Sequence, residues 1–187
     1  KGFDGSFARF ADDPDRMSTA LFWRRDLSMQ YVEDVIIYTP ENPIETENQV
    51  ISPRKLQYII AEAGCRNVVV AHFHGLWNGG SKTDTPERII QSKTIVDFLS
   101  RFSCPKILCG DFNLLPDTVS LQILENGMRN LVKEYGIIST RTAHYRNPDE
   151  PKFADYILVS PDICVKKFEV LPDIVSDHAP LYLECEI

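Results

Sequence analysis

Three short polar clusters in the C-terminal half of the chain combine residue types that can carry out chemistry. The sequences GDFN (residues 110–113), ADYI (154–157) and SDH (176–178) follow one another in this order. Each adjoins an apolar run that is typical of a buried strand, and polar groups at strand ends can be held rigidly around one point. Packing alone does not readily explain three such clusters in one small chain.

The GDFN sequence combines a flexible glycine with two oxygen-bearing side chains. Gly110 allows a sharp turn, and Asp111 and Asn113 are two residues apart, so both can face one ligand. A carboxylate beside a carboxamide is suited to positioning and deprotonating a water molecule, or to binding a hard cation through oxygen. The alternative is an Asx-type turn that merely ends a strand.

The SDH sequence places a carboxylate next to an imidazole. Asp177 supplies an oxygen ligand, and His178 can donate a hydrogen bond to a phosphate. Asp155, at the start of another strand, can accept the other N–H of this imidazole and fix its orientation. The alternative is an ordinary loop with a surface histidine.

Two further histidines end an earlier buried strand. His72 and His74 are two residues apart and therefore lie on the same side of it. A lone histidine here would usually be a hydrogen-bonded structural residue. The pair, followed by Gly75 and a polar, glycine-rich loop, favours a site.

Alternating and continuous apolar runs predict the strands that must position these clusters. We expect them at residues 18–25, 29–39, 56–63, 67–73, 106–110, 153–160, 163–170 and 181–186. Residues 1–17, with a turn at 12–15, and residues 40–53 are expected to be loops.

Two helices are predicted between these strands. Thr85 and Pro86 begin the first, which carries an apolar stripe of Ile89, Val96 and Leu99. The second covers residues 118–125. Strands outnumber helices, which indicates an α+β protein whose sheets pack together with helices outside.

Composition narrows the class of protein. A length of 187 residues is suited to a single domain, 1–187, and no apolar run reaches the roughly 20 residues that cross a bilayer. The net charge of −7 argues against a protein that coats nucleic acid, although a bound cation would let an acidic protein act on one. Five cysteines without a CxxC pair predict small buried thiols in a reducing, cytoplasmic compartment.

The ordered set of HFH, GDFN, ADYI and SDHAP resembles the endonuclease/exonuclease/phosphatase superfamily of metal-dependent phosphoesterases over most of the chain. Residues 20–25 look like the family strand that follows its metal-binding region, and residues 86–91 look like its helix after the histidine. The resemblance implies a four-layer α/β sandwich, in which two mainly antiparallel sheets pack together between helices.

The resemblance also implies roles for these residues around Mg²⁺ or Mn²⁺. Asp111 and Asn113 would orient and deprotonate the attacking water, or hold a second metal ion. Asp177 would lie near the metal, and His178 would contact the scissile phosphate during in-line attack by water.

Three further positions match the family pattern. Asp155 corresponds to the aspartate that orients the phosphate-binding histidine, and His74 to the histidine near the leaving group. His72 stands where many members have asparagine, so it is assigned to substrate binding without a defined role.

One feature of the family is missing. Its principal metal ligand is a glutamate on a strand before the segment that residues 20–25 resemble, whereas the first glutamate here is Glu33. Asp4 and the aspartates at 12, 13 and 15 are interpreted as solvated loop charges. We therefore expect that the first two strands are absent, that the fold is truncated at its N-terminus, and that this chain alone has little or no activity.

The sequence predicts a monomeric metal-dependent phosphoesterase and leaves its substrate open. The acidic composition favours a small phosphorylated molecule or a soluble phosphodiester, so the ester is either a phosphodiester or a phosphomonoester, and a DNA or RNA nuclease is the alternative. Possible substrate contacts are Trp77, Arg88, Arg141 and Arg146, each of which could equally be a structural or solvated residue. A catalytically inactive binding module is the alternative of another class, but it would not need all of the polar clusters.

Overall fold

A computed structural model describes residues 2–9, 17–41, 44–46, 49–51, 53–78, 81–146 and 152–187. The helices in these ranges are α1 (Pro86–Leu99), α2 (Val119–Leu124) and α3 (Leu131–Glu134). The strands are β1 (Phe3–Arg9), β2 (Met17–Arg24), β3 (Met29–Tyr38), β4 (Ile44–Thr46), β5 (Gln49–Ile51), β6 (Arg54–Ala63), β7 (Arg66–Phe73), β8 (Lys106–Asp111), β9 (Arg129–Asn130), β10 (Asp155–Val159), β11 (Cys164–Val170) and β12 (Leu181–Glu186).

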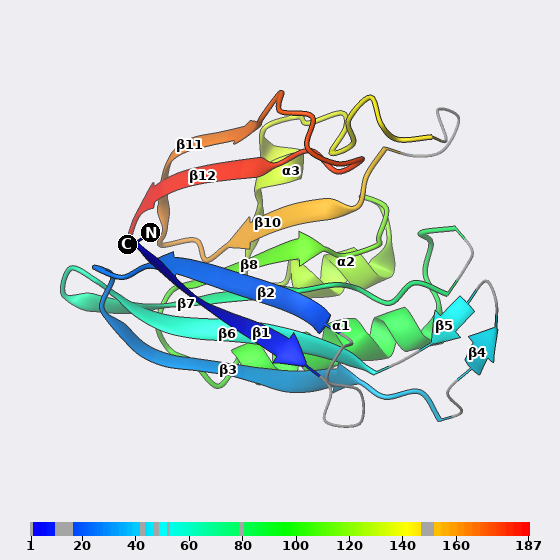
Figure 1. Ribbon diagram of the computed structural model, residues 1–187, viewed down its shortest axis with the longest axis horizontal. Coiled ribbons are helices and arrows are strands. Elements are labelled where there is room, and N and C mark those ends of the chain that lie inside the picture. Colours follow the sequence, from blue (N-terminus) through cyan, green and yellow to red (C-terminus); the bar gives the residue numbers. More distant parts are fainter. Residues whose placement is uncertain are drawn as a thin grey trace.

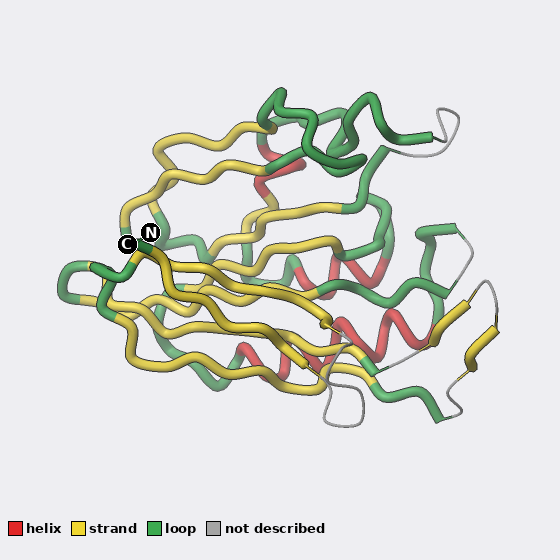
Figure 2. The backbone as a smooth tube through the Cα atoms, in the orientation of Figure 1, coloured by secondary structure: helices red, strands yellow, loops and turns green. Residues whose placement is uncertain are grey.

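The central element is a six-stranded sheet with the order β3-β6-β7-β8-β10-β9. Strands β7 and β8 run parallel, with His72 opposite Cys109, whereas β8 and β10 run antiparallel, with Asp155 opposite Asp111. The ends of β7 and β8 and the start of β10 therefore share one end of the sheet, on the right in Figure 1. The segments that continue from this end are loops (Figure 2).

The remaining elements cover the two faces of this sheet. Helices α1 and α2 lie on one face, and the β1–β2 pair lies across the other, where β2 contacts β6 and β7 (Figure 1). The pair β11–β12 lies beside β10. The predicted α+β class is confirmed, and in the described residues the second layer of strands consists of separate two-stranded sheets. No described helix is long and apolar enough to cross a membrane.

A row of aromatic rings supports the end of the sheet where the polar clusters lie. Phe112 is buried and stacks on Phe73 with ring centroids 4.5 Å apart, and it lies 5.3 Å from the ring of Tyr156. The hydroxyl of Tyr156 donates a hydrogen bond to the carbonyl of Leu114 at 2.8 Å. Because Phe112 points into this core, its neighbours Asp111 and Asn113 are held at the opposite side of the backbone.

Helix α1 begins as predicted, with Thr85 as N-cap and Pro86 in the first turn. Its buried face differs from the predicted stripe, because Ile95 and Phe98 accompany Leu99 while Ile89 and Val96 are half-buried. Polar residues, including Arg88, also lie on the buried face of α1. A pattern of apolar residues alone therefore does not identify this face.

Three predictions about loops and cysteines are corrected. Residues 3–9 form strand β1 rather than a loop, because they pair with β2, and the predicted turn at 12–15 lies outside the described residues. Strands β4 and β5 form a hairpin within the predicted loop 40–53. All five cysteines are free, but Cys65 and Cys164 are exposed rather than buried.

Two glycines allow the ends of β7 and β8 to approach each other. A Cβ atom at Gly75 would lie 2.1 Å from the carbonyl oxygen of Phe112, and one at Gly110 would lie 2.1 Å from that of Phe73. Gly110 also has a φ of +132°, a conformation that L residues rarely adopt. A 2.6 Å hydrogen bond from the N–H of Gly75 to the carbonyl of Asp111 links the two segments where they approach each other.

Replacing Gly110 with alanine should therefore disrupt the end of the sheet that carries the polar clusters. We expect Gly110→Ala to lower the free energy of unfolding by more than ~3 kcal/mol, because strain and backbone overlap combine. Gly64→Ala is the matched control, since φ is +62° there and no atom lies within 4 Å of the added Cβ. The control should cost about 1–2 kcal/mol in urea denaturation. Equal losses in the two variants would contradict the proposed crowding.

Candidate active site

The site is organised around the imidazole of His178, which precedes β12. Its Nδ1 donates to the carboxylate of Asp155, whose two oxygens both lie 2.9 Å away. Its Nε2 faces Asp111 Oδ2 at 3.7 Å. The hydrogen bond and charge of Asp155 raise the pKa of His178 above its ordinary value, while burial opposes the shift. The two ring nitrogens of His178 therefore face carboxylates on the neighbouring strands β10 and β8.

Asp111 uses its two oxygens in different ways. Oδ1 accepts a 2.9 Å hydrogen bond from the N–H of Asn113, which forms the Asx-type turn that the sequence left as an alternative. Oδ2 faces the cavity, where it lies 3.9 Å from Nε2 of His74 and 3.7 Å from Nε2 of His178. Asn113 has a φ of +53°, and its amide donates to the carbonyl of Gly75 at 3.3 Å. The turn and a cavity-facing carboxylate thus coexist.

Asp177 lies on the other side of the same imidazole. Its Oδ2 is 3.9 Å from His178 Nε2 and accepts a 2.8 Å ion-paired hydrogen bond from Nη1 of Arg141. Backbone pairing fixes this arrangement, because Thr142 N–H donates to the carbonyl of Asp177, and Ala179 N–H donates to that of Thr140. The segment around Arg141 therefore acts as a short strand beside the SDH sequence.

These side chains share a cavity of about 340 Å³. It is lined by Arg54, His74, Trp77, Lys82, Asp111, Asn113, Arg141, Tyr145, Asp177 and His178. Burial lowers the pKa of His74, and the charge of Asp111 partly opposes the effect. The sequence interpretation did not include Arg54, Lys82 and Tyr145, because no local motif marks them.

Two residues predicted to bind substrate lie outside this cavity. His72 is partly buried beneath the sheet end and hydrogen-bonds Gln57 Oε1 at 3.0 Å through Nε2. Arg88 is buried, and its guanidinium donates to the carbonyls of Leu76, Ser81 and Thr83 and to the side chain of Asn78. Arg88 therefore holds the loop after β7 in place instead of facing a ligand. Trp77, the third predicted contact, does line the cavity.

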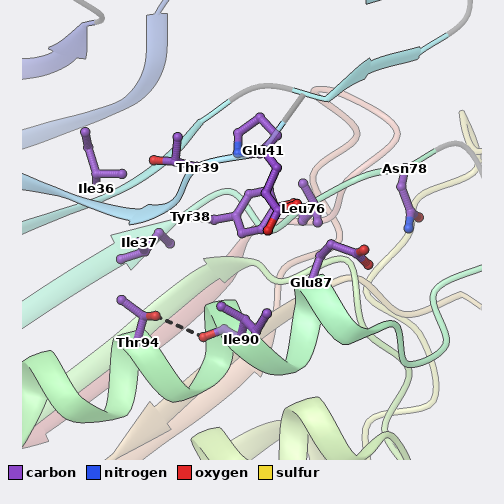
Figure 3. A pocket seen from close by; sticks show the side chains of 11 residues that line it. Ile36, Ile37, Tyr38, Thr39, Glu41, Leu76, Asn78, Glu87, Ile90 and Thr94 are labelled. Carbon is purple, nitrogen blue, oxygen red and sulfur yellow. Dashed lines mark hydrogen bonds between the residues drawn. The ribbon is translucent and has the colours of Figure 1, made fainter. Parts of the chain in front are cut away.

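Figure 3 shows a second cavity, of about 660 Å³. Leu76 and Asn78 line this cavity, and it extends between the end of β3 and the start of α1. Its charged lining residues are Glu41 and Glu87, and no basic residue or histidine is among the described residues that line it. Burial and these carboxylates raise the pKa of Tyr38. A phosphate would be repelled there, so the smaller cavity is the candidate site.

The oxygen donors in the smaller cavity fit a hard divalent cation. Asp111, Asp155 and His178 each offer a ligand atom, and these atoms lie within 4.8 Å of one another. Asp155 is hydrogen-bonded to His178 and Asp177 is ion-paired with Arg141, whereas Oδ2 of Asp111 faces the cavity. Asp111 is therefore the central ligand, Asp177 is half exposed and can turn to join it, and Asn113 lines the same cavity. Mg²⁺ commonly uses one or two carboxylates and completes its shell with water and substrate phosphate. No glutamate lines this cavity among the described residues.

Comparison with known proteins shows which family the chain resembles. A sequence model of the Endonuclease/Exonuclease/phosphatase family matches residues 3–178. The chain belongs to this family. A search of curated protein sequences gave no match.

Several solved structures share the fold of this chain. A mannosyl-6-phosphatase from Bacteroides thetaiotaomicron has a TM-score of 0.78 and 20% identity, covering 100% of this chain and 78% of that one. TDP2 from D. rerio, complexed with a single-strand DNA product, has a TM-score of 0.74 and 14% identity, covering 100% of this chain and 78% of that one. The 2',3'-cyclic phosphatase ANGEL2 has a TM-score of 0.72 and 14% identity, covering 98% of this chain and 74% of that one. These neighbours include phosphatases and a DNA-bound protein, and at such identities the likeness concerns the fold.

The buried position of His72 makes a prediction about stability. Burial lowers its pKa from 6.5 to about 4, so the folded protein keeps it neutral while the unfolded chain takes up a proton between these values. The free energy of unfolding should therefore fall as the pH decreases from 6.5 to about 4.

His72→Asn should remove ~1–3 kcal/mol of this acid-dependent loss, measured by urea denaturation across the same pH range. The exposed His144 offers a control, and His144→Asn should leave the loss unchanged. A pH dependence that is the same in His72→Asn and the wild type would show that His72 does not resist protonation.

Proposed function

We propose that the protein is a divalent-metal-dependent phosphoesterase that hydrolyses phosphate esters by in-line attack of water. The observation that carries this proposal is the convergence of three carboxylates, of Asp111, Asp155 and Asp177, within 4 Å of the ring nitrogens of His178. The imidazole, Asp111 and Asp177 line one cavity. Membership of the Endonuclease/Exonuclease/phosphatase family supports the same reaction class.

Asp111 and Asn113 orient the attacking water. The turn between them directs Asp111 Oδ2 into the cavity, where it can accept a proton from water. The water oxygen forms a bond to phosphorus while the P–O bond to the alcohol breaks, and its electron pair leaves with the alcohol oxygen. Asp111 takes one water proton, and the other stays on the oxygen newly bonded to phosphorus. The leaving oxygen takes a proton from solvent water on the His74 side of the cavity, and Asp111 returns its proton to solvent.

His178 donates to a phosphate oxygen through Nε2. Asp155 accepts the Nδ1–H, which fixes the orientation of the ring and favours its protonated form. This donor is already in place before substrate binds, so little reorganisation is needed as negative charge develops on the phosphate oxygens.

Asp111, Asp177 and Asn113 would hold the divalent cation, either Mg²⁺ or Mn²⁺. A cation at this position neutralises phosphate oxygens and supports departure of the leaving oxygen. It would also relieve the repulsion between the two carboxylates, which face the same imidazole nitrogen at 3.7 and 3.9 Å.

A nuclease is the second candidate, favoured by one observation. The ring of Trp77 lines the cavity and is 38% exposed, so it can stack on a base. A Mg²⁺- and Mn²⁺-supplemented panel of a phosphomonoester, single-stranded DNA, duplex DNA, RNA and a phospholipid separates the two candidates. The preferred substrate is the one with the highest kcat/KM.

Loss of His178 should reduce turnover without unfolding the protein. We expect His178→Ala to lower kcat by about 100- to 10,000-fold, because a positioned donor is removed. Asp155→Asn should lower kcat by a smaller factor, because the imidazole of His178 would no longer be held in its orientation. The exposed aspartate at 162 provides a control, and Asp162→Asn should retain normal turnover. A His178→Ala variant with near-normal kcat would remove this residue from the mechanism.

Removal of divalent cations should abolish hydrolysis. EDTA is expected to lower the rate to background, and excess Mg²⁺ or Mn²⁺ should restore it, because the carboxylate pair needs a hard cation. Titration of Mn²⁺ into the apoprotein by calorimetry provides a readout that is independent of turnover. Full activity after exhaustive chelation would contradict the proposed metal dependence.

A further inference from the structure

Arg141 is a buried cation in the candidate site whose hydrogen-bonding capacity is largely unused. Its side chain is only 6% exposed, and it lines the cavity with Asp111 and His178. Among the described residues, Nη1 is the only guanidinium nitrogen that donates a hydrogen bond, to Asp177, and Nε is buried with no partner. Because an unsatisfied buried donor on a charged group is costly, this position favours an anionic ligand.

The guanidinium is fixed relative to the catalytic imidazole. Arg141 and His178 form an antiparallel bridge, so their side chains are cross-strand neighbours. The guanidinium carbon lies 4.7 Å from the ring centroid of Tyr145, which supports one face of the group. Arg141 is therefore positioned by backbone pairing and by stacking before any ligand binds.

Arg141 and His178 already converge on a single anionic oxygen. Arg141 Nη1 lies 2.8 Å from Asp177 Oδ2, and His178 Nε2 lies 3.9 Å from the same atom. Asp177 itself is half exposed, so its carboxylate can turn toward a cation while the two donors remain in place. The two donors are close enough to bind two oxygens of one phosphate group.

We propose that Arg141 binds a non-bridging oxygen of the substrate phosphate and makes the site selective for terminal phosphates, that is, for phosphomonoesters. This inference rests on the proposed phosphoesterase function and adds a substrate class to it. Arg141 is a specificity-determining residue in this scheme, and Asp111 and His178 keep the roles described above.

The geometry of in-line attack explains the selectivity. Three oxygens lie around phosphorus between the attacking water and the leaving oxygen, and they carry the negative charge. In a monoester all three are unesterified, so His178 and Arg141 can each bind one, and a cation that Asp111 and Asp177 would hold would supply positive charge for the third. In a diester one of the three is bonded to carbon and is a poor partner for a buried guanidinium. Hydrolysis of the monoester yields an alcohol and inorganic phosphate.

The surrounding charge agrees with a small dianionic group. The protein has a net charge of −7, yet three basic side chains, of Arg54, Lys82 and Arg141, line this one cavity. Lys82 is buried and donates to the carbonyl of Phe153 at 2.7 Å. These three basic side chains offset the carboxylates of Asp111 and Asp177 in the same lining and supply positive charge for a terminal phosphate.

The test compares Arg141→Gln and Arg141→Lys with the wild type, using Arg101→Gln as a control, because Arg101 is exposed in the turn after α1 and does not line the cavity. Binding of inorganic phosphate is measured by calorimetry. Hydrolysis of p-nitrophenyl phosphate and of bis(p-nitrophenyl) phosphate is measured with Mn²⁺. Thermal unfolding confirms that each variant is folded, and Arg141→Lys retains the charge if the glutamine variant does not fold.

We expect the wild type to prefer the monoester. Arg141→Gln should weaken phosphate binding and lower kcat/KM for the monoester by about 10- to 100-fold, because a charge-assisted hydrogen bond is lost. The diester rate should change less than about threefold, and Arg141→Lys should recover only part of the loss because lysine lacks the planar fork. Arg101→Gln should behave as the wild type.

Two results would overturn the inference: equal losses on both esters in Arg141→Gln, or phosphate affinity that does not depend on Arg141. A different result would contradict the proposed hydrolytic function and leave the phosphate site in place. If neither ester is hydrolysed but phosphate binding still requires Arg141, the phosphate site stands and the proposed hydrolytic function fails.

Discussion

Mutual repulsion among three carboxylates is the constraint on which the site depends. Asp111, Asp155 and Asp177 surround the imidazole of His178, with oxygens 2.9 to 3.9 Å from its ring nitrogens. Like charges gathered around one ring oppose folding unless positive charge compensates them. Arg141 pairs with one carboxylate, and the raised pKa of His178 favours the imidazolium beside another. The remaining charge, on Asp111, is the one that the proposed cation would balance.

The sheet holds these charges together against their repulsion. Asp111 and Asp155 are directly paired residues of β8 and β10, and His178 is bridged to Arg141 beside them. The aromatic stack of Phe73 and Phe112 provides a rigid base, which a polar cluster on a free loop would lack. The stability of the core therefore maintains an arrangement of charges that is unfavourable locally, as is common at functional sites.

Local patterns in the sequence predict much of the fold and the composition of the polar clusters. Alternation around Phe112 indicates that Asp111 and Asn113 share one side of the backbone, and the buried runs mark β7, β8 and β10. The strand β1 was missed because Gly2 and Gly5 and the acidic turn resemble a loop, while pairing with β2 stabilises it. Long-range pairing of this kind leaves no local signal.

The most direct test of the central claim is a measurement of ³¹P relaxation of inorganic phosphate bound to the protein in the presence of Mn²⁺. If the cation and the phosphate share the cavity, Mn²⁺ should strongly accelerate relaxation of the bound phosphate in the wild type. The effect should disappear in Asp111→Asn, which removes a proposed ligand and retains the fold. Strong relaxation that persists unchanged in Asp111→Asn, or phosphate that binds beyond the reach of Mn²⁺, would contradict a shared site.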